Sequence, residues 1–155
     1  MHPVLRRIYA ARGIVHFAEI EHRLAAMASP AALGGIEEAC VLLASAIREN
    51  RQIVIVGDFD CDGASGTAVA VRGLRLLGAQ RVGYRVPNRQ AHGYGLSTAL
   101  VATLLEPPPE LIVTVDNGIA SIAGVAAARA RGIDVLVTDH HLPGPVLPAA
   151  NAIVN

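Results

Sequence analysis

The sequence contains no lysine, and aromatic residues make up only 3% of its 155 residues. Any core must therefore be built from aliphatic side chains. The 13 basic residues, all arginines, balance 13 acidic residues, so the formal net charge is zero. Nucleic-acid-binding proteins usually carry a basic excess or stripe, and the overall charge gives no such indication here.

Cysteines, a signal core and long apolar runs are also scarce. The two cysteines, Cys40 and Cys61, have the spacing of neither a disulfide framework nor a thiolate metal site, and we expect both to be small core residues. Charged side chains interrupt residues 1–25, so no apolar signal core is present there. No run of 18 uncharged apolar residues could span a membrane. We expect a soluble, cytoplasmic protein with no membrane partner.

What the sequence has is a repeated alternation of helical and strand-like segments. Short β-branched runs such as residues 53–56 and 111–115 are typical of buried strands. The expected helices are residues 36–49, 64–77, 97–105 and 121–131, and the expected strands are residues 53–56, 81–86, 111–115, 133–138 and 151–154. The alternation predicts an α/β fold with three α/β/α layers and a mainly parallel sheet over residues 31–155, after an N-terminal helical segment at residues 1–30.

Acidic and histidine side chains follow three of these expected strands directly. They are Asp58, Asp60 and Asp62 after the first strand, Asp116 after the third, and Asp139, His140 and His141 after the fourth. The carboxyl ends of parallel strands meet at one edge of a sheet, where ligands bind, so the clusters should converge. Residues two apart on an extended segment point to the same side, and we therefore expect the first three aspartates to face one cavity.

Grouped carboxylates repel one another unless a cation neutralises them. Carboxylates with imidazoles suit Mn²⁺ or Mg²⁺ better than a thiolate-type zinc site would. With Asp116 and His140 added, the ligands suffice for two ions sharing a bridge, the arrangement that clamps the attacking and leaving oxygens in phosphoryl transfer. One such cluster alone could be a helix cap or turn, whereas three at strand ends favour a metal site.

Three motifs resemble those of the DHH phosphoesterase family. They are Asp-Phe-Asp-Cys-Asp-Gly at residues 58–63, Thr-Val-Asp-Asn-Gly-Ile at residues 114–119 and Asp-His-His at residues 139–141. Val-Pro-Asn-Arg at residues 86–89, Gly-Tyr-Gly-Leu at residues 93–96 and Ala-Ile-Val-Asn at residues 152–155 are similar to the family branch that degrades single-stranded DNA. The resemblance covers roughly residues 50–155 and implies the Rossmann-like fold of that family.

The resemblance also implies a role for each metal-site residue. Asp60 and Asp62 match ligands, one for each of two Mn²⁺ or Mg²⁺ ions, and Asp58 matches an acidic position beside them. Asp116 matches the carboxylate that bridges both ions, and His140 matches a direct ligand.

Three further residues have implied roles around the substrate. His141 matches a histidine near the scissile phosphate, where with Asp116 it would act in catalysis. Asp139 is expected to orient a ligand histidine from behind. Arg89 would hold a substrate phosphate, although an ordinary surface arginine is an equally good interpretation.

The resemblance implies a metal-dependent 5′→3′ exonuclease that hydrolyses single-stranded DNA in recombination and repair, with single-strand-binding or helicase proteins as candidate partners. The family's fourth acidic motif, its second domain and an oligonucleotide-binding module have no match here. Asn155 follows an apolar, strand-like run. We therefore expect this chain to be part of a longer protein, and to bind metal weakly without exonuclease activity when isolated.

Alternatives remain open at this point. A nano-RNase, a cyclic-dinucleotide phosphodiesterase or a pyrophosphatase of the same family would share the acidic and Asp-His-His motifs. Such an enzyme would not be expected to carry Pro-Asn-Arg at residues 87–89 followed by Gly-Tyr-Gly-Leu at residues 93–96. A non-catalytic interaction protein with the same fold would be expected to lose metal ligands. A nucleotide-binding domain is disfavoured because no Gly-x-Gly-x-x-Gly or Gly-x-x-x-x-Gly-Lys-Ser/Thr motif occurs.

Overall fold

The computed structural model describes all residues, 1–155, and divides them into two compact units. The first unit is Met1–Ala32 and the second is Leu33–Asn155.

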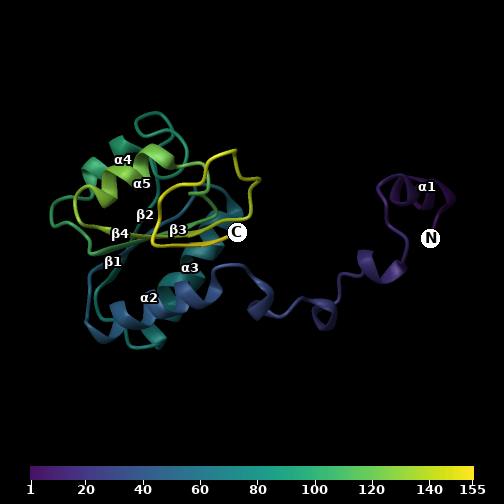
Figure 1. Ribbon diagram of the computed structural model, residues 1–155, viewed down its shortest axis with the longest axis horizontal. Coiled ribbons are helices and arrows are strands. Elements are labelled where there is room, and N and C mark those ends of the chain that lie inside the picture. The colour runs from purple at the N-terminus through teal and green to yellow at the C-terminus, as the bar shows by residue number, and fades with distance from the viewer. The chain divides into compact units, whose positions relative to one another are not determined.

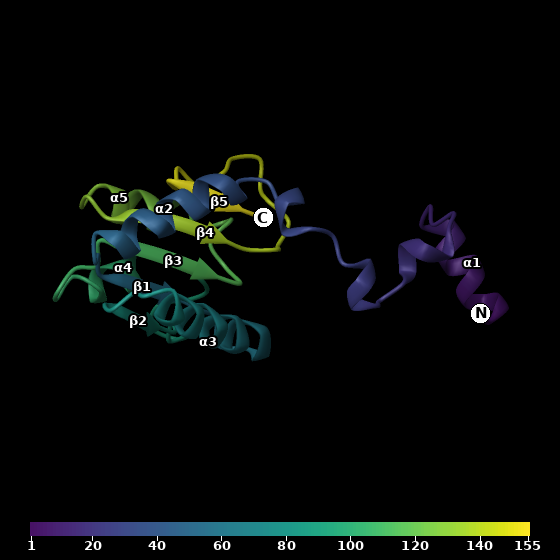
Figure 2. The same cartoon turned by 90° about the horizontal axis from the view of Figure 1, so that it is seen from below.

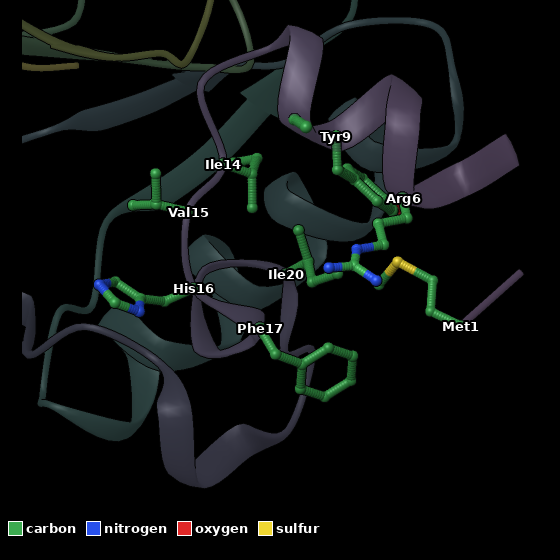
Figure 3. Close-up of a pocket in the computed structure, with 9 residues that line it drawn as sticks. Met1, Arg6, Tyr9, Ile14, Val15, His16, Phe17 and Ile20 are labelled. Carbon is green, nitrogen blue, oxygen red and sulfur yellow. The ribbon is translucent and has the colours of Figure 1, made fainter. Parts of the chain in front are cut away.

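The first unit is helical, as expected. Helix α1 (Pro3–Ala11) begins with a proline at its first position, and the backbone N–H of Val4 donates to Nδ1 of His2. Three short 3₁₀ helices follow, at Phe17–Ile20, Leu24–Ala26 and Pro30–Ala32. A pocket of about 400 Å³ lies within this unit, with Arg6 among mainly apolar side chains such as Phe17 and Ile20 (Figure 3). No predicted site residue lines it.

The second unit is built on a five-stranded parallel sheet. Its strands are β1 (Ile53–Val56), β2 (Val82–Arg85), β3 (Leu111–Val115), β4 (Asp134–Thr138) and β5 (Ala152–Val154), in the order β2-β1-β3-β4-β5. Every neighbouring pair is parallel. The apolar, β-branched character of β1 and β3 suits strands that are covered on both faces. The prediction of a mainly parallel sheet is confirmed.

Helices cover both faces of this sheet, which confirms the three-layer prediction (Figure 1). Helices α2 (Ile36–Arg48) and α3 (Cys61–Leu76) pack on one face, and α4 (Thr98–Thr103) and α5 (Ile122–Arg129) pack on the other. Alternate strand residues serve the two faces: Ile53 and Ile55 pack with α2 and α3, whereas Val54 and Val56 face α4 and α5. Each fully buried aliphatic side chain contributes about 1.5–3 kcal/mol.

The strand order creates a topological switch point, where the connections that follow two neighbouring strands leave in opposite directions. From β1 the chain passes through α3 to β2 on one side, and from β3 it passes through α5 to β4 on the other. The two connections lie on opposite faces, and in sheets of this kind the crevice beside the carboxyl ends of two such strands, here β1 and β3, is the usual ligand position. Figure 2 shows the arrows of β3 and β4 pointing to the same edge.

Some local predictions were wrong. Helix α3 begins at Cys61, three residues before the expected start at residue 64, because Asp60 caps it. The cysteines are both exposed, not core residues.

No single helix is long and apolar enough to cross a membrane, although residues 24–32 and 36–48, separated by a bend, meet the length and composition requirement together.

Candidate metal centre

The loop after β1 places two aspartates at the crevice. Asp58 is buried, and its Oδ1 accepts a hydrogen bond from the N–H of Phe59 at 2.8 Å. Asp60 caps α3, with its Oδ1 accepting from the N–H of Gly63 at 3.0 Å. A glycine is required at position 63, because a Cβ there would lie 2.6 Å from the Cβ of Asp58. The hydrogen bond from Gly63 is the largest cause of a lowered pKa at Asp60.

The sequence predicts that Asp62 lies on an extended segment, but in the structure it does not. It lies in the first turn of α3, so the expectation that three alternating aspartates face one cavity is wrong in its geometry. The cap at Asp60 starts the helix and turns the chain before position 62. The helix still directs Asp62 toward the site, and its Oδ2 lies 3.8 Å from Nε2 of His140.

Asp116 directly follows β3 and has an unusual backbone conformation. Its φ of 63° is left-handed, which is uncommon for residues other than glycine but tolerated by aspartate. Its N–H donates to the carbonyl of Thr138 at 3.1 Å. The next residue, Asn117, is fully buried and donates from Nδ2 to the carbonyls of Val56 at 3.0 Å and Val115 at 2.9 Å. Asn117 thereby joins the ends of β1 and β3 at the crevice.

Two groups of ligand atoms meet at Asp116. Oxygens of Asp58, Asp60 and Asp116 lie within 4.8 Å of one another, and atoms of Asp116, His140 and His141 do the same. Nε2 of His140 is 2.7 Å from Oδ1 of Asp116. The pKa of Asp116 is raised, mainly because the side chain is buried. The hydrogen bond with His140 lowers this pKa, and the negative charges of Asp62 and Asp60 raise it further.

This donor set suits a divalent cation. Three carboxylates within 4.8 Å repel one another, and a cation between them would remove that repulsion. Oxygen ligands with imidazole nitrogen and no thiolate fit Mn²⁺ or Mg²⁺. Asp116 belongs to both groups, so its carboxylate lies within 4.8 Å of the aspartate oxygens on one side and of the histidine nitrogens on the other.

Asp139 fixes the positions of His140 and His141 through hydrogen bonds. Its side chain is only 1% exposed and accepts hydrogen bonds from the backbone N–H groups of Ile119 at 2.9 Å, His140 at 2.8 Å and His141 at 3.2 Å. The ring Nδ1 of His141 lies 2.7 Å from the same carboxylate. Burial acts to raise the pKa of Asp139, but these hydrogen bonds together outweigh it and the pKa is lowered. The hydrogen bond to Asp139 raises the pKa of His141.

Two residues in this site were quoted in motifs but given no role by sequence reasoning. Asn117 is one of them, and Tyr94 is the other. The hydroxyl of Tyr94 donates to the carbonyl of Asp116 at 2.9 Å and lies 3.4 Å from Nδ1 of His141. Burial, then the negative charge of the aspartates, raises the pKa of Tyr94 to about 12, so the hydroxyl keeps its proton as a donor. The flanking glycines of Gly-Tyr-Gly were the available sequence signal.

Arg89 lies outside both ligand groups. Its guanidinium carbon is 4.9 Å from the centroid of the Phe59 ring, a cation–π arrangement. Phe59 stands between Asp58 and Asp60 in the sequence, so the arginine contacts the loop that carries two of the carboxylates. It comes from the β2–α4 loop, which also carries Tyr94.

The fold and site together define a doubly wound α/β domain with a carboxylate–histidine centre at the switch point. A sequence model of the DHH family, N-terminal domain, matches residues 52–155, and the chain belongs to that family.

The chain is also similar to individual proteins with this domain. It is 54% identical over 152 residues to the single-stranded-DNA-specific exonuclease RecJ of Dickeya dadantii, a match that covers 98% of this chain and 26% of that protein. The RecJ of Escherichia coli is 51% identical over 153 residues, covering 99% and 26%. A crystal structure of exonuclease RecJ bound to manganese superposes with a TM-score of 0.72 and 42% identity, over 79% of this chain and 31% of that one. The chain thus spans about a quarter of the length of its curated relatives.

Proposed function

We propose that this chain is the metal-binding catalytic part of a 5′→3′ exonuclease that hydrolyses single-stranded DNA in recombination and repair. The observation that carries the proposal is the convergence of Asp58, Asp60, Asp116 and His140 at the switch point, in a chain more than half identical to a RecJ exonuclease. The proposal places its action in the cytoplasm, with single-stranded DNA as substrate.

The proposed cofactor is a pair of Mn²⁺ or Mg²⁺ ions. A related RecJ was crystallised with manganese, and the ligand atoms here have the types that manganese takes. Asp116 would bridge the two ions because it belongs to both ligand groups. Asp60 and Asp62 would each hold one ion, with Asp58 beside them and His140 as a nitrogen ligand.

Bound divalent cations would polarise the phosphodiester and offset the negative charge that develops during its hydrolysis. The chain's own residues would orient the substrate and handle the proton. With Nδ1 of His141 engaged by Asp139, its Nε2 remains free to hold a proton at a phosphate oxygen. The planar guanidinium of Arg89, which lies over the ring of Phe59 in the loop after β1, would donate to a phosphate of the strand.

The activity can be tested in a chimera in which this chain replaces the matching 153 residues of Escherichia coli RecJ. With Mn²⁺ and a 5′-phosphorylated single strand, we expect mononucleotides to be released from the 5′ end. Asp116→Asn in the chimera should lower the rate by about a thousandfold or more, because stabilisation by a metal site is worth several kcal/mol.

Glu38→Gln is the matched control, since it makes the same change from acid to amide at an exposed position of α2. It should leave the rate unchanged. Cleavage of dinucleotides but not of long strands would instead indicate another type of DHH phosphoesterase. Equal activity in the Asp116→Asn chimera would refute the proposed site.

A further inference from the structure

We propose that Tyr94 is a positioning residue that holds Asp116 and His141 in place, and so ties the β2–α4 loop to the metal centre. The inference rests on the proposed function in one respect, because it takes Asp116 as a metal ligand. The inference gives a role to the Gly-Tyr-Gly-Leu motif at residues 93–96. This motif contains neither a proposed metal ligand nor the arginine proposed to bind phosphate.

The backbone around Tyr94 is shaped to deliver its side chain. Gly93 has φ 74° and Gly95 has φ 69°, so both neighbours adopt the left-handed conformation that glycine takes without strain. A Cβ on Gly95 would lie 3.1 Å from Oγ of Ser121 and 3.5 Å from Oδ1 of Asn117. The loop is therefore packed closely against the turn that follows β3.

The hydroxyl of Tyr94 joins three loops. Tyr94 lies between β2 and α4, Asp116 follows β3, and His141 follows β4. The hydroxyl donates to the Asp116 carbonyl at 2.9 Å and lies 3.4 Å from Nδ1 of His141, whose ring stands edge-on to the tyrosine ring at 6.0 Å. One side chain thus contacts Asp116, which is shared by the two ligand groups, and His141, which belongs to one of them.

Asp116 needs such support because of its backbone. A left-handed conformation at a residue other than glycine costs about 1–3 kcal/mol and persists only when its surroundings fix it. The carbonyl of Asp116 accepts a hydrogen bond from the Tyr94 hydroxyl, and the N–H of Asp116 donates a hydrogen bond to the carbonyl of Thr138. Both peptide groups of this residue are therefore held. Without the hydroxyl, the Asp116 carboxylate would sample orientations away from its partners.

The position of Arg89 gives this link a consequence. Arg89 and Tyr94 lie on the same connection between β2 and α4, and Arg89 also contacts Phe59 beside the first carboxylates. The β2–α4 loop, which would bind a substrate phosphate through Arg89, is thus joined to the proposed metal ligand Asp116 by the hydrogen bond from Tyr94.

The test compares Mn²⁺ binding by calorimetry for the full chain, Tyr94→Phe and Tyr84→Phe. Both changes remove only a phenolic hydroxyl, and Tyr84 is an exposed residue of β2 that belongs to neither ligand group. Tyr94→Phe should weaken Mn²⁺ binding by about tenfold, the lower range for residues that support a metal ligand. Its thermal midpoint without metal should lie only a few degrees below that of Tyr84→Phe, as expected for the loss of one hydrogen bond.

Unchanged Mn²⁺ affinity in Tyr94→Phe would overturn the proposal, as would an equal loss of affinity in Tyr84→Phe. A second measurement needs no metal: the ¹³C resonance of the Asp116 carbonyl and the amide exchange of residues 116–118, by NMR. Tyr94→Phe should shift the resonance and speed the exchange, while Tyr84→Phe should change neither. If the unaltered chain binds no Mn²⁺, the metal part of the proposed function fails, and unchanged NMR signals would then refute the role of Tyr94 on their own.

Discussion

Replacing Asp139 with asparagine should destabilise the second unit by about 3 kcal/mol near pH 5. The carboxylate accepts four hydrogen bonds, on both of its oxygens, and is almost fully buried. An asparagine keeps one of these oxygens and turns an NH₂ group toward donors, so at least one buried N–H loses its acceptor. Hydrogen bonds to a charged group contribute about 1.5–3 kcal/mol each, and an orphaned buried donor costs about 1–3 kcal/mol.

The destabilisation should depend on pH in a defined direction. The pKa of Asp139 is lowered from 3.8, so its contribution is complete above pH 3.8 and is lost as pH falls through the folded value. The pKa of His141 is raised from 6.5, so the part that depends on its charge is complete below pH 6.5 and is lost as pH rises through the folded value. The difference between the two proteins should be largest between these limits and smaller at pH 9.

Urea unfolding followed by circular dichroism, in EDTA at pH 5, 7 and 9, measures this difference. Glu38→Gln, which removes an exposed acid from the first turn of α2, is the control and should cost no more than about 0.3–1 kcal/mol, the contribution of an acid at a helix N-terminus. A difference for Asp139→Asn that stays below about 1 kcal/mol, under the range for one charged hydrogen bond, would refute the reasoning. A difference of constant size from pH 5 to pH 9 would refute the part assigned to His141.

Three other predictions concern packing and the metal. Gly124→Ala should destabilise the chain by about 2 kcal/mol or more, because its Cβ would lie 1.8 Å from the carbonyl oxygen of Leu96. Gly73→Ala has open space around it and should stabilise α3 by about 0.5–1 kcal/mol. Thermal unfolding measures both changes. Asn117→Ala should cost about 2–3 kcal/mol in urea unfolding, because the buried carbonyl of Val56 and the partly buried carbonyl of Val115 lose their donor. Mn²⁺ at a hundred times its dissociation constant should raise the free energy of unfolding by about 2.7 kcal/mol, and EDTA should reverse the effect.

The fold could be predicted from sequence because local signals carry it. The apolar runs at residues 53–56 and 111–115 are short and rich in β-branched residues, as is typical of strands covered on both faces. Ser97 caps α4 through a hydrogen bond from the N–H of Leu100, as its position suggested. The early start of α3 was missed because the acidic run was interpreted as extended, although Asp60 is a standard capping residue.

The finer geometry of the site depends on contacts between distant residues. The left-handed conformation of Asp116 is supported by Thr138 and Tyr94, which lie 22 residues away in opposite directions. The bridging position of Asn117 requires β1 and β3 to be neighbours, which only the strand order determines. Cys61 is exposed because it occupies the outer side of a helical turn that was not expected there.

The central claim is that Asp116 unites the strand ends into one metal site, and Mn²⁺ calorimetry on the chain tests it most directly. The unaltered chain and Glu38→Gln should bind Mn²⁺ alike, if weakly. Asp116→Asn should abolish detectable binding, because it removes a carboxylate shared by both ligand groups. Binding that survives Asp116→Asn, or is absent from all three proteins, would contradict the account.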